Sequence, residues 1–247
     1  MNREQKLIRN WTDSSNDYSN SVKEELNSFK KQAWTNMILD HSEKRTGMAV
    51  LDVGTGPGFF AIILSQAGNK VTAIDCTTAM IEEAKANAKD EGVTVDFRVA
   101  DGQNLEFEDQ CFDLIVSRNV AWTLIDAERA YGEWQRVLKP SGKIMIFDSN
   151  WNIRLFNEDY LKRYEEDQQE YERLFGEKPP QYTAEMIEYR KSMPMCQRIR
   201  PQWDFDALVR LGFKKIYCET SIGDRVYDEK QKVRYHSSPL FMLVVEK

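Results

Sequence analysis

The stretch VLDVGTGPGFF, residues 50–60, decides how the rest of this sequence is interpreted. An apolar run carries Asp52 near its end, glycines follow at alternate positions, and a second apolar run begins at Phe59. Apolar residues on both sides of a glycine-rich segment predict a buried strand, a tight turn and the start of a helix. Such a turn brings backbone N–H groups close to a ligand that resembles a nucleotide.

The composition limits the class of protein. The chain has 247 residues, 41% of them hydrophobic and 30% charged, which is typical of a globular protein with one large domain. A net charge of −6 argues against nucleic acid as the main partner. No signal peptide or membrane-spanning run is visible, and four scattered cysteines with two distant histidines predict no metal site. We expect a cytoplasmic protein with no membrane partner; the sequence does not indicate its oligomeric state.

Strand and helix patterns alternate along most of the chain. Alternation of this kind predicts a parallel sheet with helices on both faces. After residue 203 a helix is followed by two strands with no helix predicted between them, so we expect an antiparallel pair at the sheet edge. The predicted fold is α/β, with a doubly wound, mostly parallel sheet of seven strands, at 48–53, 70–75, 94–99, 112–117, 143–148, 214–220 and 239–247. The helical pattern before the fifth strand extends from 127 to 142.

Two segments lie outside this alternation and divide the chain into four parts. The expected parts are an N-terminal helical cap at 1–46, a cofactor-binding core at 47–149, an inserted helical lid at 150–202, and the rest of the core at 203–247.

Asp52 and the residues after the glycines discriminate between three nucleotide-like ligands. A P-loop requires Gly-Lys-Ser/Thr after the glycines, where Phe59 and Phe60 stand instead. The dinucleotide fingerprint G-x-G-x-x-G requires a third glycine at position 59, whereas this sequence has G-x-G-x-G. A carboxylate at Asp52 repels a pyrophosphate but attracts S-adenosylmethionine, which carries a sulfonium and an ammonium. Unit charges in contact interact by roughly 1–4 kcal/mol, so the sequence favours S-adenosylmethionine over NAD.

Three further residues are candidates for binding this ligand. Asp75 ends the second strand, where a carboxylate accepts hydrogen bonds from ribose hydroxyls, in NAD as well. Met80 lies about one helical turn later and is placed to cover the adenine. Asp101 follows the third strand, where it can accept a hydrogen bond from the adenine amino group, although DGQN is also an ordinary turn sequence.

Four segments in series resemble the class I S-adenosylmethionine-dependent methyltransferases. The resemblance covers about residues 48–149, and the terminal strand pair matches more loosely. It implies a Rossmann-like fold with an antiparallel seventh strand, and S-adenosylmethionine as the cofactor. It also implies that Gly54, Gly56 and Gly58 approach the methionine portion, Asp75 the ribose and Asp101 the adenine. The segments are LDVGTGPG (51–58), AIDCTTAMIEEAK (73–85), VADGQNLEFEDQCFDLIVSRNVAWTL (99–124) and EWQRVLKPSGKIMIFD (133–148).

Residues that follow the fourth and fifth strands are candidates for the reacting centre, because open α/β sheets bind ligands at the carboxyl ends of their strands. Asn119 is a candidate for cofactor contact and catalysis, and Trp122 for substrate contact or for core packing. No Asn/Asp-Pro-Pro-aromatic motif, typical of methyltransferases that modify base or amide nitrogens, stands here. Asp148 is a candidate general base or a buried structural acid, and Asn150 a candidate substrate ligand.

Aromatic residues near the N-terminus add Tyr18 as a further candidate catalytic residue. Many small-molecule methyltransferases, which this sequence resembles, have a leading aromatic segment that folds over the cofactor. Tyr18, with Trp11, fits that pattern, and an aromatic face near a sulfonium gains cation–π energy. Simple packing between helices is the alternative.

The basic stretch YRKSMPMCQRIRPQW, residues 189–203, contains no acidic residue. Arg198 and Arg200 are candidates for binding a substrate carboxylate or phosphate, which a guanidinium fits well. The alternative is a set of salt bridges to the acidic segment 158–172.

The sequence thus predicts in-line methyl transfer from S-adenosylmethionine to a small-molecule acceptor. The protein would mainly position the nucleophile and exclude water. The alternatives are an RNA or protein methyltransferase and a non-catalytic module that binds S-adenosylmethionine.

Overall fold

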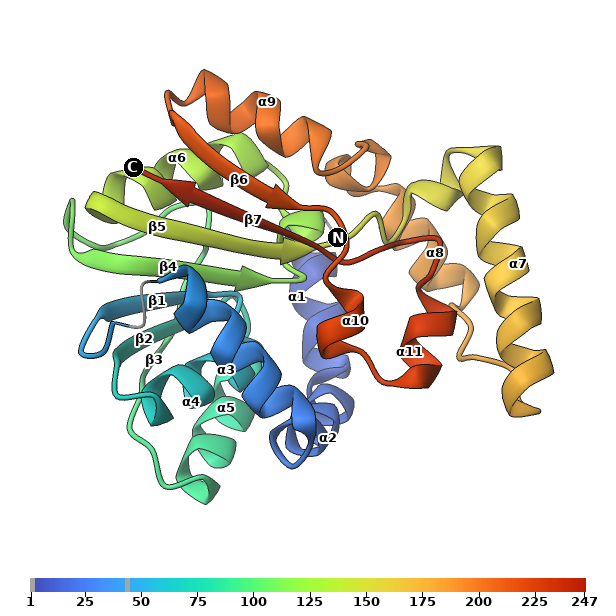
Figure 1. Cartoon of the computed structure of the whole chain (residues 1–247), viewed down its shortest axis with the longest axis horizontal. Coiled ribbons are helices and arrows are strands. Elements are labelled where there is room, and N and C mark those ends of the chain that lie inside the picture. Colours follow the sequence, from blue (N-terminus) through green and yellow to red (C-terminus); the bar gives the residue numbers. More distant parts are fainter. Residues whose placement is uncertain (1–2, 43–44) are drawn as a thin grey trace.

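The strand predicted at 48–53 is β1 (Ala49–Val53), and it lies inside a seven-stranded sheet in the computed structural model of the chain (Figure 1). The structure describes residues 3–42 and 45–247. In these residues the strand order is β3-β2-β1-β4-β5-β7-β6. The other strands are β2 (Lys70–Asp75), β3 (Asp96–Val99), β4 (Phe112–Arg118), β5 (Leu138–Asp148), β6 (Lys215–Glu219) and β7 (Phe241–Glu246).

The first five strands are parallel, and β7 runs antiparallel between β5 and β6. The chain order reverses between β1 and β4, which are neighbours in the sheet. Such a switch point leaves a crevice at the carboxyl ends of the strands, where open α/β sheets bind ligands. The predicted doubly wound sheet with an antiparallel terminal pair is confirmed.

Two predicted details are wrong. The helix expected to run to residue 142 ends at Val137, and β5 begins at Leu138. Pro140 explains this difference, because proline cannot continue a helix and restricts the residue before it. Two short helices, α10 (Gly223–Val226) and α11 (Glu229–Arg234), also lie between β6 and β7, where the sequence pattern predicts none. They leave the antiparallel pairing of these strands intact.

Helices cover both faces of the sheet (Figure 1). Successive strand residues point to opposite faces, so Val50 packs in one hydrophobic layer and Leu51 in a second, both fully buried. In the first layer Trp34, Phe60 and Phe147 pack edge to face with ring centroids 5.0–5.5 Å apart. The first layer holds α3 (Phe29–His41), α4 (Phe59–Gln66) and α5 (Thr78–Asp90), and the second holds α6 (Ala127–Val137) and α9 (Gln202–Arg210).

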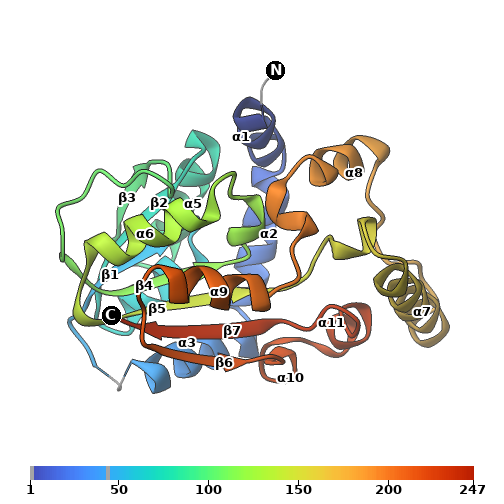
Figure 2. The ribbon, with the colours of Figure 1, turned by 90° about the horizontal axis from the view of Figure 1, so that it is seen from above.

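Further helices gather beyond the carboxyl ends of the parallel strands, as both views show (Figures 1 and 2). The expected N-terminal cap, 1–46, contains three helices, but α3 packs on the sheet and only the first two lie near this edge; residues 1–2 and 43–44 are outside the described residues. The helices at the edge are α1 (Arg3–Asp13), α2 (Ser15–Leu26), α7 (Glu158–Phe175) and α8 (Ala184–Lys191). Short 3-10 turns accompany them at Ala121–Thr123, Ile153–Leu155 and Pro194–Gln197.

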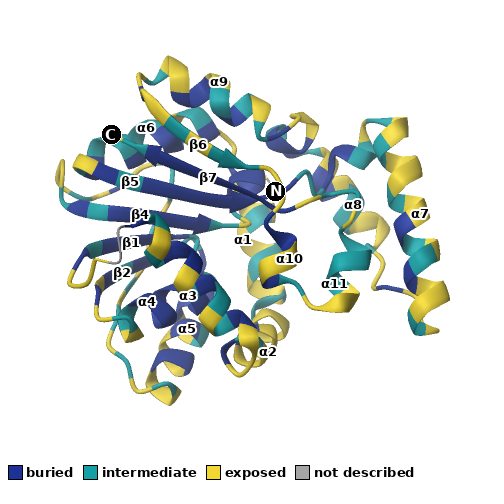
Figure 3. Cartoon of the chain, in the orientation of Figure 1, coloured by how far each residue is buried: buried dark blue, intermediate teal, exposed yellow. Residues whose placement is uncertain are grey.

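Burial separates the sheet from this outer layer (Figure 3). The five inner strands are mostly buried and the edge strands β3 and β6 are not, whereas α7 buries only Asp167 and Tyr171. None of the helices in the described residues is both long enough and apolar enough to cross a membrane.

Candidate active site

A cavity of about 630 Å³ lies at the carboxyl edge of the sheet, where β1 and β4 end. Nine predicted residues line it: Tyr18, Asp52, Gly54, Gly56, Asp75, Met80, Asp101, Asn119 and Trp122. Five predicted residues do not: Gly58, Asp148, Asn150, Arg198 and Arg200.

Asp52 is buried at the end of β1, where its Oδ2 accepts a hydrogen bond of 2.6 Å from Thr55 Oγ1. Burial raises the pKa of Asp52 to about 6, although the Thr55 bond and the charge of Arg118 both lower it. A positive charge nearby favours the ionised form of a buried carboxylate. The position therefore suits a cationic ligand group and is unfavourable for a pyrophosphate.

Asp75 connects the glycine turn to the start of α5. Its Oδ2 accepts from the Gly56 N–H at 3.1 Å, and its Oδ1 accepts from the Thr77 N–H and Oγ1–H, each at 3.0 Å. Burial raises the pKa of Asp75. Gly56 has φ +52° and a Cβ there would meet nothing within 4 Å, so the turn faces open space in the cavity. The backbone can therefore approach a ligand closely at Gly56.

Gly58 has a different place in the structure. It caps the N-terminus of α4 with φ +93°, and a Cβ there would lie 3.2 Å from the Cβ of Ala84 on α5. The absence of a side chain at Gly58 allows α4 and α5 to pack closely, and Gly58 does not line the cavity.

Three more predicted cofactor residues surround the same space. Met80 is buried in the first turn of α5. Asp101 Oδ1 accepts from the backbone and side-chain N–H groups of Gln103 at 2.9 and 3.1 Å, so it forms a turn and lines the cavity as well. Asn119 is exposed, has φ +59°, and donates its backbone N–H to the Phe147 carbonyl at 2.8 Å. The structure brings these residues together with Asp75 around one cavity.

Aromatic side chains from distant segments form another part of the wall. The Trp11 ring packs edge-on against Tyr18 and Trp122, with centroids 5.3 and 5.9 Å away. Tyr18 remains 46% exposed on the cavity wall. Partial burial raises the pKa of its hydroxyl, more than Arg190 lowers it. Tyr18 thus stays protonated near neutral pH, so its hydroxyl can donate a hydrogen bond.

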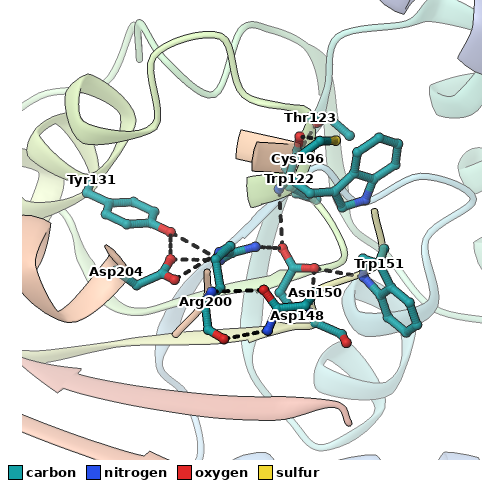
Figure 4. Close-up of polar contacts among 11 residues, drawn as sticks. Trp122, Thr123, Tyr131, Asp148, Asn150, Trp151, Cys196, Arg200 and Asp204 are labelled. Carbon is teal, nitrogen blue, oxygen red and sulfur yellow. Dashed lines mark hydrogen bonds and ion pairs between the residues drawn. The ribbon is translucent and has the colours of Figure 1, made fainter. Parts of the chain in front are cut away.

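Asp148 belongs to a buried network (Figure 4). Its Oδ2 accepts from Arg200 Nη1 at 2.5 Å and from the Trp122 N–H at 3.3 Å, and its Oδ1 accepts from the Trp151 indole at 2.9 Å. Arg200 also pairs with Asp204, which accepts a bond of 2.6 Å from the Tyr131 hydroxyl. Burial lowers the pKa of Arg200, but the charges of the two carboxylates together outweigh it, so the pKa is raised. Both carboxylate oxygens of Asp148 are engaged in this network. Asp148 therefore fits the role of a buried structural acid better than that of a general base.

The predicted substrate ligands lie beside the cavity rather than in it. Asn150 Nδ2 donates to the Arg200 carbonyl at 2.6 Å, and its Oδ1 accepts from the Arg200 N–H at 2.8 Å. Arg198 is exposed and, with Asn150 and Arg200, lines a neighbouring pocket of about 10 Å³, room for at most one water molecule. Arg200 is engaged by Asp148 and Asp204, not by the acidic segment 158–172.

Known proteins match the part of the chain that carries this geometry. Residues 51–146 match a family described as a methyltransferase domain. Residues 51–146 form a class I methyltransferase domain. Over 113 residues the chain is 33% identical to the uncharacterised methyltransferase YcgJ of Bacillus subtilis, covering 45% of each protein. Over 120 residues it is 31% identical to the ubiquinone/menaquinone biosynthesis C-methyltransferase UbiE of Idiomarina loihiensis, covering 47% of this chain and 48% of the relative. The chain thus spans about half the length of these relatives.

The fold likeness extends beyond the methyltransferase domain. A Methanococcus maripaludis structure, assigned to the S-adenosylmethionine-dependent methyltransferases, superposes with a TM-score of 0.62 at 20% identity. The match covers 96% of this chain and 93% of that one. The predicted family, Rossmann-like fold and cofactor class are confirmed.

Sequence reasoning missed several residues that the structure places around the methyltransferase site. Arg118 ends β4; its guanidinium pairs with Glu25 at 2.8 Å and lies 4.6 Å from the Phe59 ring centroid. The rule that ligands bind at strand ends predicts this position. Trp151 follows β5 and obeys the same rule. The lining residues Tyr182, Arg190 and Tyr235 are not distinguished by any sequence pattern, because only the tertiary fold brings their segments to the cavity.

The described residues contain no group of three or more histidine, cysteine, aspartate or glutamate side chains placed to hold a metal ion.

Proposed function

We propose that this protein transfers a methyl group from S-adenosylmethionine to a small-molecule acceptor. The observation that carries this proposal is the single cavity shared by the cofactor residues of the methyltransferase domain and the aromatic wall formed by Trp11, Tyr18 and Trp122. Its volume of about 630 Å³ falls within the range of roughly 300–1,000 Å³ that is usual for small-molecule sites. When bound, S-adenosylmethionine supplies a methyl group that a nucleophile displaces in line from the sulfonium.

The residues at one side of the cavity fit that cofactor. Asp52 is a buried carboxylate suited to the ammonium or sulfonium, and the open turn at Gly56 admits the ligand to the backbone. Asp75 keeps a lone pair on Oδ2 for a ribose hydroxyl, and Asp101 keeps its Oδ2 for the adenine amino group. Met80 presents an apolar surface to the adenine. A pyrophosphate in place of the methionine portion would meet Asp52 with like charge.

The residues at the other side position the acceptor. Trp11, Tyr18 and Trp122 exclude water from the site, and Tyr18 donates a hydrogen bond to the acceptor. Asp148 holds Trp122 and Trp151 in place through its hydrogen bonds and takes no proton. The acceptor therefore attacks with a group that is nucleophilic without a buried base. The helices of 150–202 form a lid over this side, with Tyr182 and Arg190 in the wall.

The relative UbiE, a ubiquinone/menaquinone biosynthesis C-methyltransferase, supports a small acceptor. An acidic chain with a net charge of −6 is a poor partner for an RNA backbone, which disfavours RNA as the acceptor.

Release of S-adenosylhomocysteine tests the proposal. The protein is incubated with S-adenosylmethionine and either the low-molecular-weight filtrate or the retained macromolecules of an extract from cells that make it. We expect multiple turnovers only with the filtrate. Turnover only with the macromolecules would support the RNA or protein alternative, and binding without turnover in either fraction would support a non-catalytic module.

A further inference from the structure

Arg190 is a buried cation in the wall of the cavity. It lies on α8 and is 8% exposed. Among the described residues it forms no ion pair with a carboxylate, its one hydrogen bond runs from Nη1 to Asn152 Oδ1 at 3.1 Å, and its Nε has no partner. A guanidinium has five N–H donors, so most of those on Arg190 are unused. Buried charges are normally paired, which makes this position unusual.

Two aromatic rings keep the charge of Arg190 favourable without satisfying its donors. The guanidinium carbon lies 4.7 Å from the ring centroid of Trp122 and 4.0 Å from that of Tyr182. Ring faces attract a cation, but they accept none of the N–H groups that lie in the guanidinium plane. The side chain is thus oriented and charged, with an edge free for a planar acceptor.

The other two arginines that line the cavity do not share these features. Arg118 pairs with Glu25 at 2.8 Å. Arg129 is exposed and bonds Asn104 Oδ1 at 3.1 Å. Arg190 is therefore the lining arginine that is both buried and without a carboxylate.

We propose that Arg190 binds an anionic group of the methyl acceptor, a carboxylate or a phosphate, through a bidentate contact. This inference rests on the proposed function, because it names the class of acceptor for the same site. Planar, two-point recognition of these oxyanions is the geometry that arginine serves best. The cofactor carboxylate is the competing anion. In the cofactor half of the cavity, the charge of Arg118 lowers the pKa of Asp52. Arg190 instead packs on Trp122 in the acceptor half.

Anion exchange of the low-molecular-weight filtrate tests the charge of the acceptor. We expect acceptor activity in the retained, anionic fraction. Phosphatase treatment of that fraction distinguishes the two anions: activity is lost if the group is a phosphate and kept if it is a carboxylate. Activity in the unretained fraction would overturn the inference and leave methyl transfer to a small molecule intact, whereas activity in neither fraction would count against both proposals.

Substitution tests the residue itself. With the retained fraction, Arg190→Gln should raise the apparent KM about tenfold to a hundredfold, and Arg190→Lys should restore part of the loss. Lys191→Gln removes the same charge from an exposed neighbour that pairs with Glu188, and it should match the wild type. Affinity for S-adenosylhomocysteine should be unchanged in all three. A parallel loss of that affinity in Arg190→Gln would assign Arg190 to the cofactor carboxylate and overturn the inference.

A binding measurement that needs no turnover complements this on the wild-type protein. The measured quantity is binding of the acceptor in the retained fraction to protein saturated with S-adenosylhomocysteine. Benzoate or phenyl phosphate should compete with this binding, and uncharged benzamide should not. Equal competition by benzamide, or none by either anion, would contradict a role for Arg190 in anion binding.

Discussion

Arg200 and Asp148 form a buried ion pair across 52 residues of sequence, with Nη1 2.5 Å from Oδ2. The pair joins the residues just before α9 to the end of β5. Through the same carboxylate, Asp148 accepts hydrogen bonds from Trp122 and Trp151, and both of these residues line the cavity. The network therefore links Arg200, just before α9, to two residues in the wall of the cavity.

Arg200→Met should destabilise the fold by about 3–5 kcal/mol, because it leaves the carboxylates of Asp148 and Asp204 buried without their cation. The loss should be smaller at acidic pH, because burial raises the pKa of Asp148 and its protonation removes one of these charges. Arg198→Met is the matched control, since Arg198 is exposed, and it should change stability little. Urea unfolding at two pH values measures the free energy of unfolding of both variants. Equal stability of the two variants would show that Arg200 is not a structural residue.

This network shows where sequence reasoning ends. The β1–turn–α4 segment was predictable because the pattern of apolar residues and glycines is local, and the acids at Asp52 and Asp75 follow from strand ends. The partners of Arg200 were not predictable, because Asp148 lies on another element and the charge pattern pointed to the acidic segment 158–172. In the sequence Arg190 is only one of several cations in the basic stretch 189–203. Which of them lines the cavity depends on which side of α8 faces it, and the sequence pattern does not show that.

Asp52→Asn should stabilise the ligand-free protein and weaken cofactor binding. The folded-state pKa of Asp52 is raised from 3.8 to about 6, so burying its charge costs about 3 kcal/mol at neutral pH. A neutral amide avoids that cost, and the Tm should rise by several degrees. Affinity for S-adenosylmethionine should fall at least tenfold, since a charge-assisted contact is lost. A lower Tm with unchanged affinity would contradict this role.

The raised pKa of Asp52 predicts that both protein stability and cofactor binding depend on pH. Because the folded-state pKa is raised, the folded protein binds more protons than the unfolded chain between about pH 4 and pH 6, and stability falls as pH rises through that window. Binding of S-adenosylmethionine should respond in the opposite sense, weakening as pH falls below about 6 and Asp52 becomes protonated. Calorimetric titration across this range should show the trend in the wild type and not in Asp52→Asn. A flat wild-type profile would exclude Asp52 from cofactor binding.

Asp75→Ala should weaken binding of S-adenosylhomocysteine by roughly ten- to a hundredfold in a folded protein. The carboxylate accepts from the Gly56 N–H in the turn, and we propose that it also accepts from the ribose. Asp96→Ala, at an exposed carboxylate on β3, is the control and should bind as the wild type does. Gly56→Val should bind worst, since its side chain would project into open cavity space from a backbone with φ +52°. Wild-type affinity in a folded Asp75→Ala protein would refute the ribose assignment.

Methyl-labelled S-adenosylmethionine gives the most direct measurement of the central proposal. The protein is incubated with this cofactor and a whole extract of the cells that make it, and the label is then followed by ultrafiltration and mass spectrometry. We expect label in one or a few small anionic molecules, with none accumulating in protein or RNA, and a strong reduction in Arg190→Gln. Label confined to macromolecules, or no transfer by a protein that binds the cofactor, would contradict it.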